Sequence, residues 1–176
     1  FKMYRSRVVE RFGEEVDREL RHNIKKRTIE EPYYDPETGE KGVTKSQVDV
    51  VEVDPNDPND YSDYARFYDE LCKEWTKSPE YNLTYLKARQ EEANMILKRD
   101  GYLFLNTVYD MLGIPRTKAG QIVGWVYDKN NPIGDNFVDF GIYEAKRTAN
   151  RDFVNGYEPV ILLDFNVDGS IIEHLP

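Results

Sequence analysis

Apolar residues recur every four positions along the first 27 residues of the chain. The series consists of Tyr4, Val8, Phe12, Val16, Leu20 and Ile24. A spacing of four predicts a helix over residues 1–27. Because a helix has 3.6 residues per turn, each step rotates the apolar stripe by about 40°. We therefore expect a long N-terminal helical arm, residues 1–30, whose two ends meet different neighbours.

Residues 31–63 have a different composition, rich in proline, glycine and acidic side chains. Residues 35–39, Asp-Pro-Glu-Thr-Gly, form a turn sequence. Alternating valines predict a short strand over residues 47–53, and a loop with two prolines follows over 54–60. The sequence thus predicts a solvated acidic connector with one short strand.

The remaining residues, 64–176, predict one compact α+β domain. Its first half contains a strand over 64–68, a helix over 79–99 that ends at Gly101, and a helix over 104–112 that ends at Gly113. A short fourth helix is predicted from about Thr117 to Val123 or Trp125. Alternation then predicts strands over 137–143 and 159–167, and Asp168 followed by glycine predicts a hairpin turn.

These patterns together predict an α+β fold with a long N-terminal helix, a helical middle and a small C-terminal antiparallel sheet. An aromatic content of 13%, with 13 Tyr and 8 Phe, excludes a wholly disordered chain. The single cysteine, Cys72, excludes an intrachain disulfide and fits a cytoplasmic protein. No apolar run approaches the roughly 18–20 residues of a membrane-spanning helix.

One segment matches the first half of a calcium-binding loop. Asp164, Asn166 and Asp168 stand at the spacing of its first three oxygen ligands, and a glycine follows. However, Leu175 stands where such a loop needs a bidentate carboxylate. In a strand the three polar residues would simply share one face, so we favour a hairpin over a cation site.

A second segment has the outline of a helix-turn-helix. The helix over 104–112 ends before a proline, and Arg116, Thr117, Lys118 and Gln121 then occupy positions from which a second helix could read DNA. The net charge of −9 argues against coating nucleic acid by charge alone. That deficit equals the −9 of residues 31–70, so a local anion-binding surface at residues 116–118 stays open.

The sequence offers no recognisable catalytic or cofactor-binding motif. Its two histidines, His22 and His174, stand near opposite ends, and there is no nucleophile elbow, phosphate-binding loop or zinc-ligand pair. We therefore predict a protein that is not an enzyme and that needs no cofactor.

From Phe67 onward the chain carries a series of longer motifs. They are residues 75–83, residues 93–94, residues 101–106, residues 108–120, residues 123–125, residues 134–143, residues 153–156 and residues 162–169. In these motifs the chain resembles a family of unknown function found in tailed phages and prophages of Gram-positive bacteria. The resemblance is looser over the first 66 residues.

This resemblance implies a biological setting but no catalytic residues. Similar members carry apolar, membrane-spanning segments before a helix like 1–27, which implies a tether upstream of Phe1. The chain would then be the soluble part of a protein in the virion or the host cytoplasm, at the inner face of the host membrane. We expect a non-enzymatic phage accessory or virion protein that acts through protein–protein contacts or self-assembly. The alternative is a helix-turn-helix-like DNA-binding phage factor that uses residues 116–121.

Overall fold

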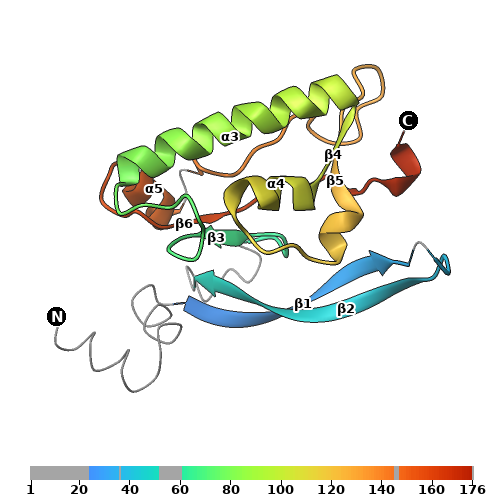
Figure 1. Ribbon diagram of the computed structural model, residues 1–176, viewed down its shortest axis with the longest axis horizontal. Helices are drawn as coiled ribbons and strands as arrows, with labels where there is room; N and C mark the ends of the chain where they lie inside the picture. The colour runs from blue at the N-terminus through green and yellow to red at the C-terminus, as the bar shows by residue number, and fades with distance from the viewer. Residues whose placement is uncertain (1–23, 36, 52–60, 145–146, 176) are drawn as a thin grey trace.

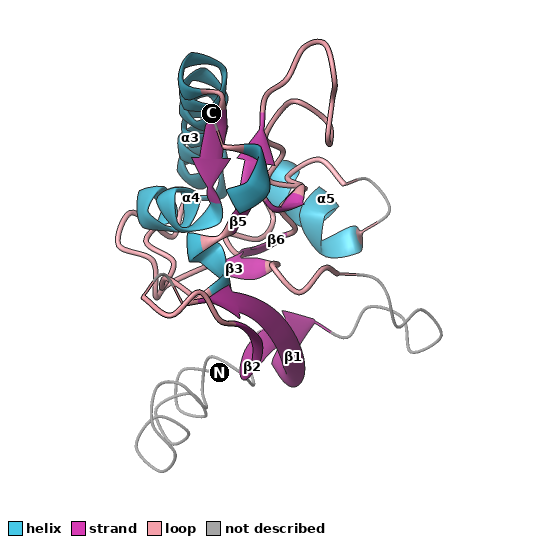
Figure 2. Cartoon of the chain, turned by 90° about the vertical axis from the view of Figure 1, so that its right-hand side faces the viewer, coloured by secondary structure: helices cyan, strands magenta, loops and turns pink. Residues whose placement is uncertain are grey.

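The computed structural model describes residues 24–35, 37–51, 61–144 and 147–175, which form an α+β fold. Three layers are stacked in it (Figures 1 and 2). Helix α3 (Pro79–Asp100) forms one outer layer. A hairpin of β1 (Ile24–Tyr34) and β2 (Lys41–Val51) forms the other. The predicted α+β class is confirmed, with three small antiparallel sheets in place of one C-terminal sheet.

Short elements fill the middle layer. They are β3 (Arg66–Tyr68), β4 (Tyr102–Phe104), α4 (Leu105–Leu112), the 3-10 turn η1 (Ala119–Gln121), β5 (Val123–Val126), α5 (Thr148–Val154), β6 (Ile161–Leu163), β7 (Gly169–Ser170) and the 3-10 turn η2 (Ile172–His174). Strand β3 pairs with β6, and β5 lies between β4 and β7.

The two predicted central helices are confirmed, and their ends have physical causes. The Ser78 side chain caps α3 by accepting a hydrogen bond from the Tyr81 amide, and Pro79 occupies the first helical position. Gly101 (φ 84°) and Gly113 (φ 71°) end α3 and α4 in the left-handed conformation that glycine adopts without strain.

The core lies between these helices and the strands beneath them. Its largest fully buried side chains are Trp125, Tyr68, Tyr109, Phe140 and Phe153. Tyr109 and Phe140 each meet Phe165 edge to face, with ring centroids 5.7 and 5.4 Å apart. Such aromatic pairs add about 1 kcal/mol each beyond the apolar area that they bury.

The end of the predicted N-terminal helix is wrong, and the rest of that prediction lies in residues 1–23, outside the described residues. Residues 24–34, which include the last part of the predicted arm, form strand β1. Strand β1 pairs with β2 in an unbroken antiparallel register from Ile24 opposite Val51 to Tyr34 opposite Lys41. A spacing of four also places residues on one face of a strand, because four is a multiple of the strand period of two.

The predicted strand over 47–53 is confirmed as far as Val51, although it begins earlier, at Lys41. The predicted turn at 35–39 is confirmed as the hairpin loop, since Gly39 has φ 74° and the Asp35 amide donates to the Glu40 carbonyl. Much of the expected solvated connector is therefore a regular strand pair.

The predicted fourth helix is also wrong. Residues 119–121 form a single 3-10 turn, and residues 123–126 form the fully buried strand β5. The apolar run that contains Trp125 pairs with β4, a strand missing from the prediction.

Two C-terminal predictions need correction. Asp168 does not turn β6 back on itself, because β6 pairs with β3 whereas β7 pairs with β5. Residues 137–143 do not form a strand. Val138, Phe140 and Ile142 are nevertheless buried, as the alternation predicts. Side-chain amides of α3 replace a neighbouring strand here, since the Val138 and Phe140 amides donate to Asn94 and Gln90.

Candidate interaction groove

A groove of about 380 Å³ separates strand β2 from the body of the molecule. The residues that line it are 46–49 of β2, Arg66 and Phe67 of β3, Asp69, Leu71, Cys72 and residues 113–117 after α4. Four consecutive residues of β2 border the groove, so the edge of the strand forms one wall. Most of its buried floor is apolar, formed by Val48, Phe67, Cys72 and Ile114 together with the buried Asp69. Leu71 stands at its rim with 70% of its surface exposed.

The hairpin register decides which backbone groups of β2 face outward. Asp35 and Glu40 form a hydrogen-bonded pair, and such pairs alternate with non-bonded pairs along an antiparallel ladder. Since the register runs without a bulge, the amides and carbonyls of Val43, Lys45 and Gln47 point away from β1. Within the part of the chain that the structure describes, β2 pairs with β1 alone. The groove therefore borders the edge of β2 at which Lys45 and Gln47 have no strand partner among the described residues.

The opposite edge of the hairpin is different. Pro32 lies opposite Val43, at a non-bonded position of β1. An ordinary residue would point its amide outward there, but proline has no amide proton to offer. Prolines on edge strands prevent further strands from adding. The hairpin thus has one blocked edge and one open edge.

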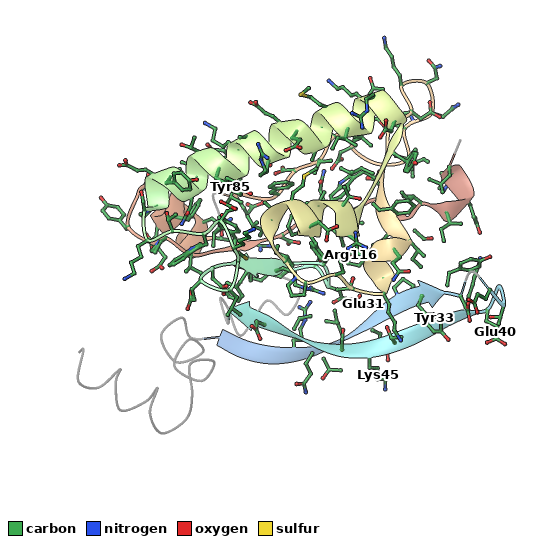
Figure 3. The ribbon with its side chains drawn as sticks, in the orientation of Figure 1. Glu31, Tyr33, Glu40, Lys45, Tyr85 and Arg116 are labelled. Atoms are coloured by element: carbon green, nitrogen blue, oxygen red, sulfur yellow. The ribbon has the colours of Figure 1, made fainter. Side chains whose placement is uncertain are left out.

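A buried ion pair holds the hairpin against the body beside the groove. The Arg66 guanidinium of β3 donates to the Glu31 carboxylate of β1 at 3.1 Å, and these side chains are only 14% and 3% exposed. The Ser46 hydroxyl donates to the same carboxylate at 3.3 Å. Figure 3 shows Glu31 between the hairpin and the body. A second arginine, Arg27, bonds the Asp63 carboxylate at 2.9 Å.

Asn106 of α4 holds the far wall of the groove in place. Its side-chain amide donates to the Thr117 carbonyl at 2.9 Å and accepts from the Thr117 amide at 3.0 Å. Gly120 approaches closely, since a Cβ there would lie 2.0 Å from Asn106 Oδ1. Residue 120 therefore has to be glycine for the Asn106 side chain to fit between Gly120 and Thr117.

The residues predicted to read DNA do not lie on a recognition helix. Arg116 donates to the Asp110 carboxylate at 2.9 Å through Nε, and Figure 3 shows it beside α4. This contact lowers the pKa of the Asp110 carboxyl and raises that of Arg116. The Thr117 hydroxyl accepts from the Gly120 amide at 2.9 Å. Lys118 and Gln121 are exposed at the two ends of the 3-10 turn.

Two of the three residues of the predicted cation loop bond to different neighbours. Asp164 accepts from the Ser62 amide and from Arg147, at 3.3 and 3.2 Å. Asp168 accepts from the Val126 amide at 2.9 Å. Burial and, more weakly, the charge of Asp135 raise the pKa of the Asp168 carboxyl.

The third residue, Asn166, connects three segments of the core. Its Oδ1 accepts from the Trp125 indole at 2.9 Å and from the Asp139 amide at 2.7 Å, while its Nδ2 donates to Asp135. Among the described residues, no group of three or more histidine, cysteine or carboxylate side chains is placed to hold a metal ion. The contacts of Asp164, Asn166 and Asp168 instead connect loops to the core.

Sequence reasoning missed both the open edge of β2 and the amide contacts that shape the groove. An asparagine on the apolar face of a predicted helix, such as Asn82 or Asn106, is the signal that could have found those contacts, because asparagine is a poor helix former. No helix in the described part of the chain is long and apolar enough to cross a membrane.

Comparison with known proteins gives a family without an assigned activity. The family model described as "Family of unknown function (DUF6353)" matches residues 1–175, so the chain belongs to this family. No curated protein and no solved structure matches the chain. The expectation of an uncharacterised family is confirmed, whereas the phage origin stays a prediction.

Proposed function

We propose that this member of an uncharacterised family is a non-enzymatic protein-binding module whose partner docks in the groove beside β2. The observation that carries the proposal is the combination, in one groove, of an open strand edge and an apolar floor. Apolar side chains that stay in water, such as Leu71, are stabilised when a partner covers them.

The resemblance to phage proteins extends this proposal to a biological role. On that ground we propose an accessory or virion protein of a tailed phage, which acts through protein–protein contacts. The groove supports contact with a protein better than contact with DNA. Its cations Arg66 and Arg116 are already paired with Glu31 and Asp110, and its floor is apolar.

Site-specific photo-crosslinking tests the proposal in cells whose own genome encodes this protein. Leu71, in the groove, is replaced by p-benzoylphenylalanine, and Met95, on the outer face of α3, serves as the matched control. The two side chains are 70% and 71% exposed, so neither replacement disturbs the core. We expect one defined protein adduct from position 71 and none from position 95. No adduct at position 71, or the same adducts from both positions, would contradict the proposal.

A further inference from the structure

The open edge of β2 specifies the shape of what binds there. We infer that the groove accepts an extended segment of a partner protein, which adds to the hairpin as a third strand beside β2. This inference rests on the proposed function and names the partner's conformation. The partner segment that fits this edge has an extended backbone and an apolar side chain at every second position.

The backbone groups of β2 supply the first argument. The outward amides and carbonyls of Val43, Lys45 and Gln47 repeat at every second residue. An extended strand presents its own donors and acceptors at this same repeat, which is why peptides add to exposed sheet edges. A helix satisfies its own backbone groups internally and offers no such row. The chemistry of this wall therefore favours a strand.

The side chains that line the groove supply the second argument. An added strand forms hydrogen-bonded pairs with the outward residues, so its residues opposite Ser46 and Val48 point toward the body. There they meet the exposed Leu71 and the apolar residues Ile114 and Pro115. Apolar side chains at alternate positions of the peptide would cover this surface, whereas charged ones would lose their hydration.

The layers of the fold favour a single strand over a second copy of the chain. Antiparallel pairing of two β2 edges about a two-fold axis puts both bodies on the same face of the joined sheet. Among the residues that the structure describes, the body covers one face of the hairpin (Figure 2), and residues 113–117 and Leu71 already form a wall on that face. The body of a second copy would meet this wall, whereas a single strand has no body to place there.

A pair of proline substitutions tests the inference on the full chain. Gln47→Pro removes an outward amide from the open edge, and the matched control Thr28→Pro removes the outward amide of the residue directly opposite, on the blocked edge. The probe is a fluorescent nine-residue peptide of alternating valine and threonine with a lysine at each end. We expect it to bind with a Kd of about 1 mM or tighter, about tenfold more weakly to Gln47→Pro, and without change to Thr28→Pro.

A second measurement uses the crosslinked adduct at position 71. We expect Gln47→Pro to abolish this adduct and Thr28→Pro to retain it. Equal adducts in both variants would overturn strand addition and leave the proposed function standing, whereas the absence of any adduct would remove the proposed function itself. Failure of the peptide to bind the unsubstituted chain overturns the inference. The inference is also overturned if light scattering shows that the unsubstituted chain is a dimer, and that Gln47→Pro dissociates this dimer whereas Thr28→Pro does not.

Discussion

In several irregular segments of this molecule, side-chain amides hydrogen-bond the backbone groups that a neighbouring strand would otherwise bond. Asn94, Asn106, Asn136 and Asn166 each bond the backbone of a segment outside a regular sheet. A buried backbone amide without a partner costs free energy, so irregular segments need such side chains. This pattern explains how segments without a strand partner keep their backbone groups hydrogen-bonded.

The Asn106 contact yields a direct prediction about stability. Asn106→Ala leaves the Thr117 amide and carbonyl without their partners, and we expect it to lower the free energy of unfolding by about 2 kcal/mol. Urea unfolding measures this change. The control is Asn130→Ala on an exposed loop, which should change the free energy by less than about 0.5 kcal/mol. Equal effects of the two substitutions would contradict the stabilising role of the hydrogen bonds between Asn106 and Thr117.

Asp168 yields a prediction about pH. Its pKa is raised above 3.8 in the folded chain, mainly by burial, so the folded state holds the proton more tightly than the unfolded state. The stability that this proton contributes is fully present in acid and is lost as the pH rises through the raised pKa. Asp168→Asn removes the titration. We therefore expect its stability relative to the unsubstituted chain to increase as the pH rises from 3.8 through the raised pKa of Asp168. Urea titrations measure the difference in the free energy of unfolding between Asp168→Asn and the unsubstituted chain at each pH. A difference that is constant or falls as the pH rises would show that burial of this carboxyl costs nothing.

At the scale of elements, the hairpin depends on charged groups as well as on apolar packing. Only Ile29 and Val48 of the hairpin are buried apolar residues among those described, and the Glu31–Arg66 pair lies close to them. Removing one member of a buried ion pair leaves the other charge uncompensated. The hairpin should therefore loosen when Glu31 loses its charge.

Glu31→Gln tests this dependence. We expect it to lower the free energy of unfolding by about 2 kcal/mol, less than for a fully buried pair because Arg66 keeps its bonds to the Asp63 and Ala65 carbonyls. Glu30→Gln, one residue away, is the control. Its carboxylate is 66% exposed and lies 4.0 Å from Lys45, so the expected change is below about 0.5 kcal/mol. Thermal unfolding that fails to separate the two variants would contradict the role of Glu31.

The accuracy of the sequence predictions depended on whether local signals decide an element. Caps and glycines predicted α3 and α4 well, because Pro79, Gly101 and Gly113 act within one turn of the chain. The strand over Val123–Val126 was mistaken for a helix, since a short buried apolar run has no period that separates the two. Pairing of β7 with β5 depends on long-range contacts that no local pattern contains.

At the scale of the whole molecule, the fold places an open strand edge beside an apolar groove while it blocks the opposite edge. The hairpin lies as a separate layer under the body (Figure 1), and its inner face packs on the body while Lys45 and Gln47 stay exposed. Natural proteins usually protect a free strand edge against aggregation. An edge left open beside a hydrophobic wall is therefore expected to have a partner.

Hydrogen exchange of the β2 amides tests the open edge most directly. In the free chain, the amides of Thr44, Ser46 and Val48 bond to β1 and should exchange slowly, whereas those of Val43, Lys45 and Gln47 should exchange fast. Addition of the valine–threonine peptide should slow the second set alone. Equal protection of both sets in the free chain would show that the edge is already paired, and that result would contradict the account.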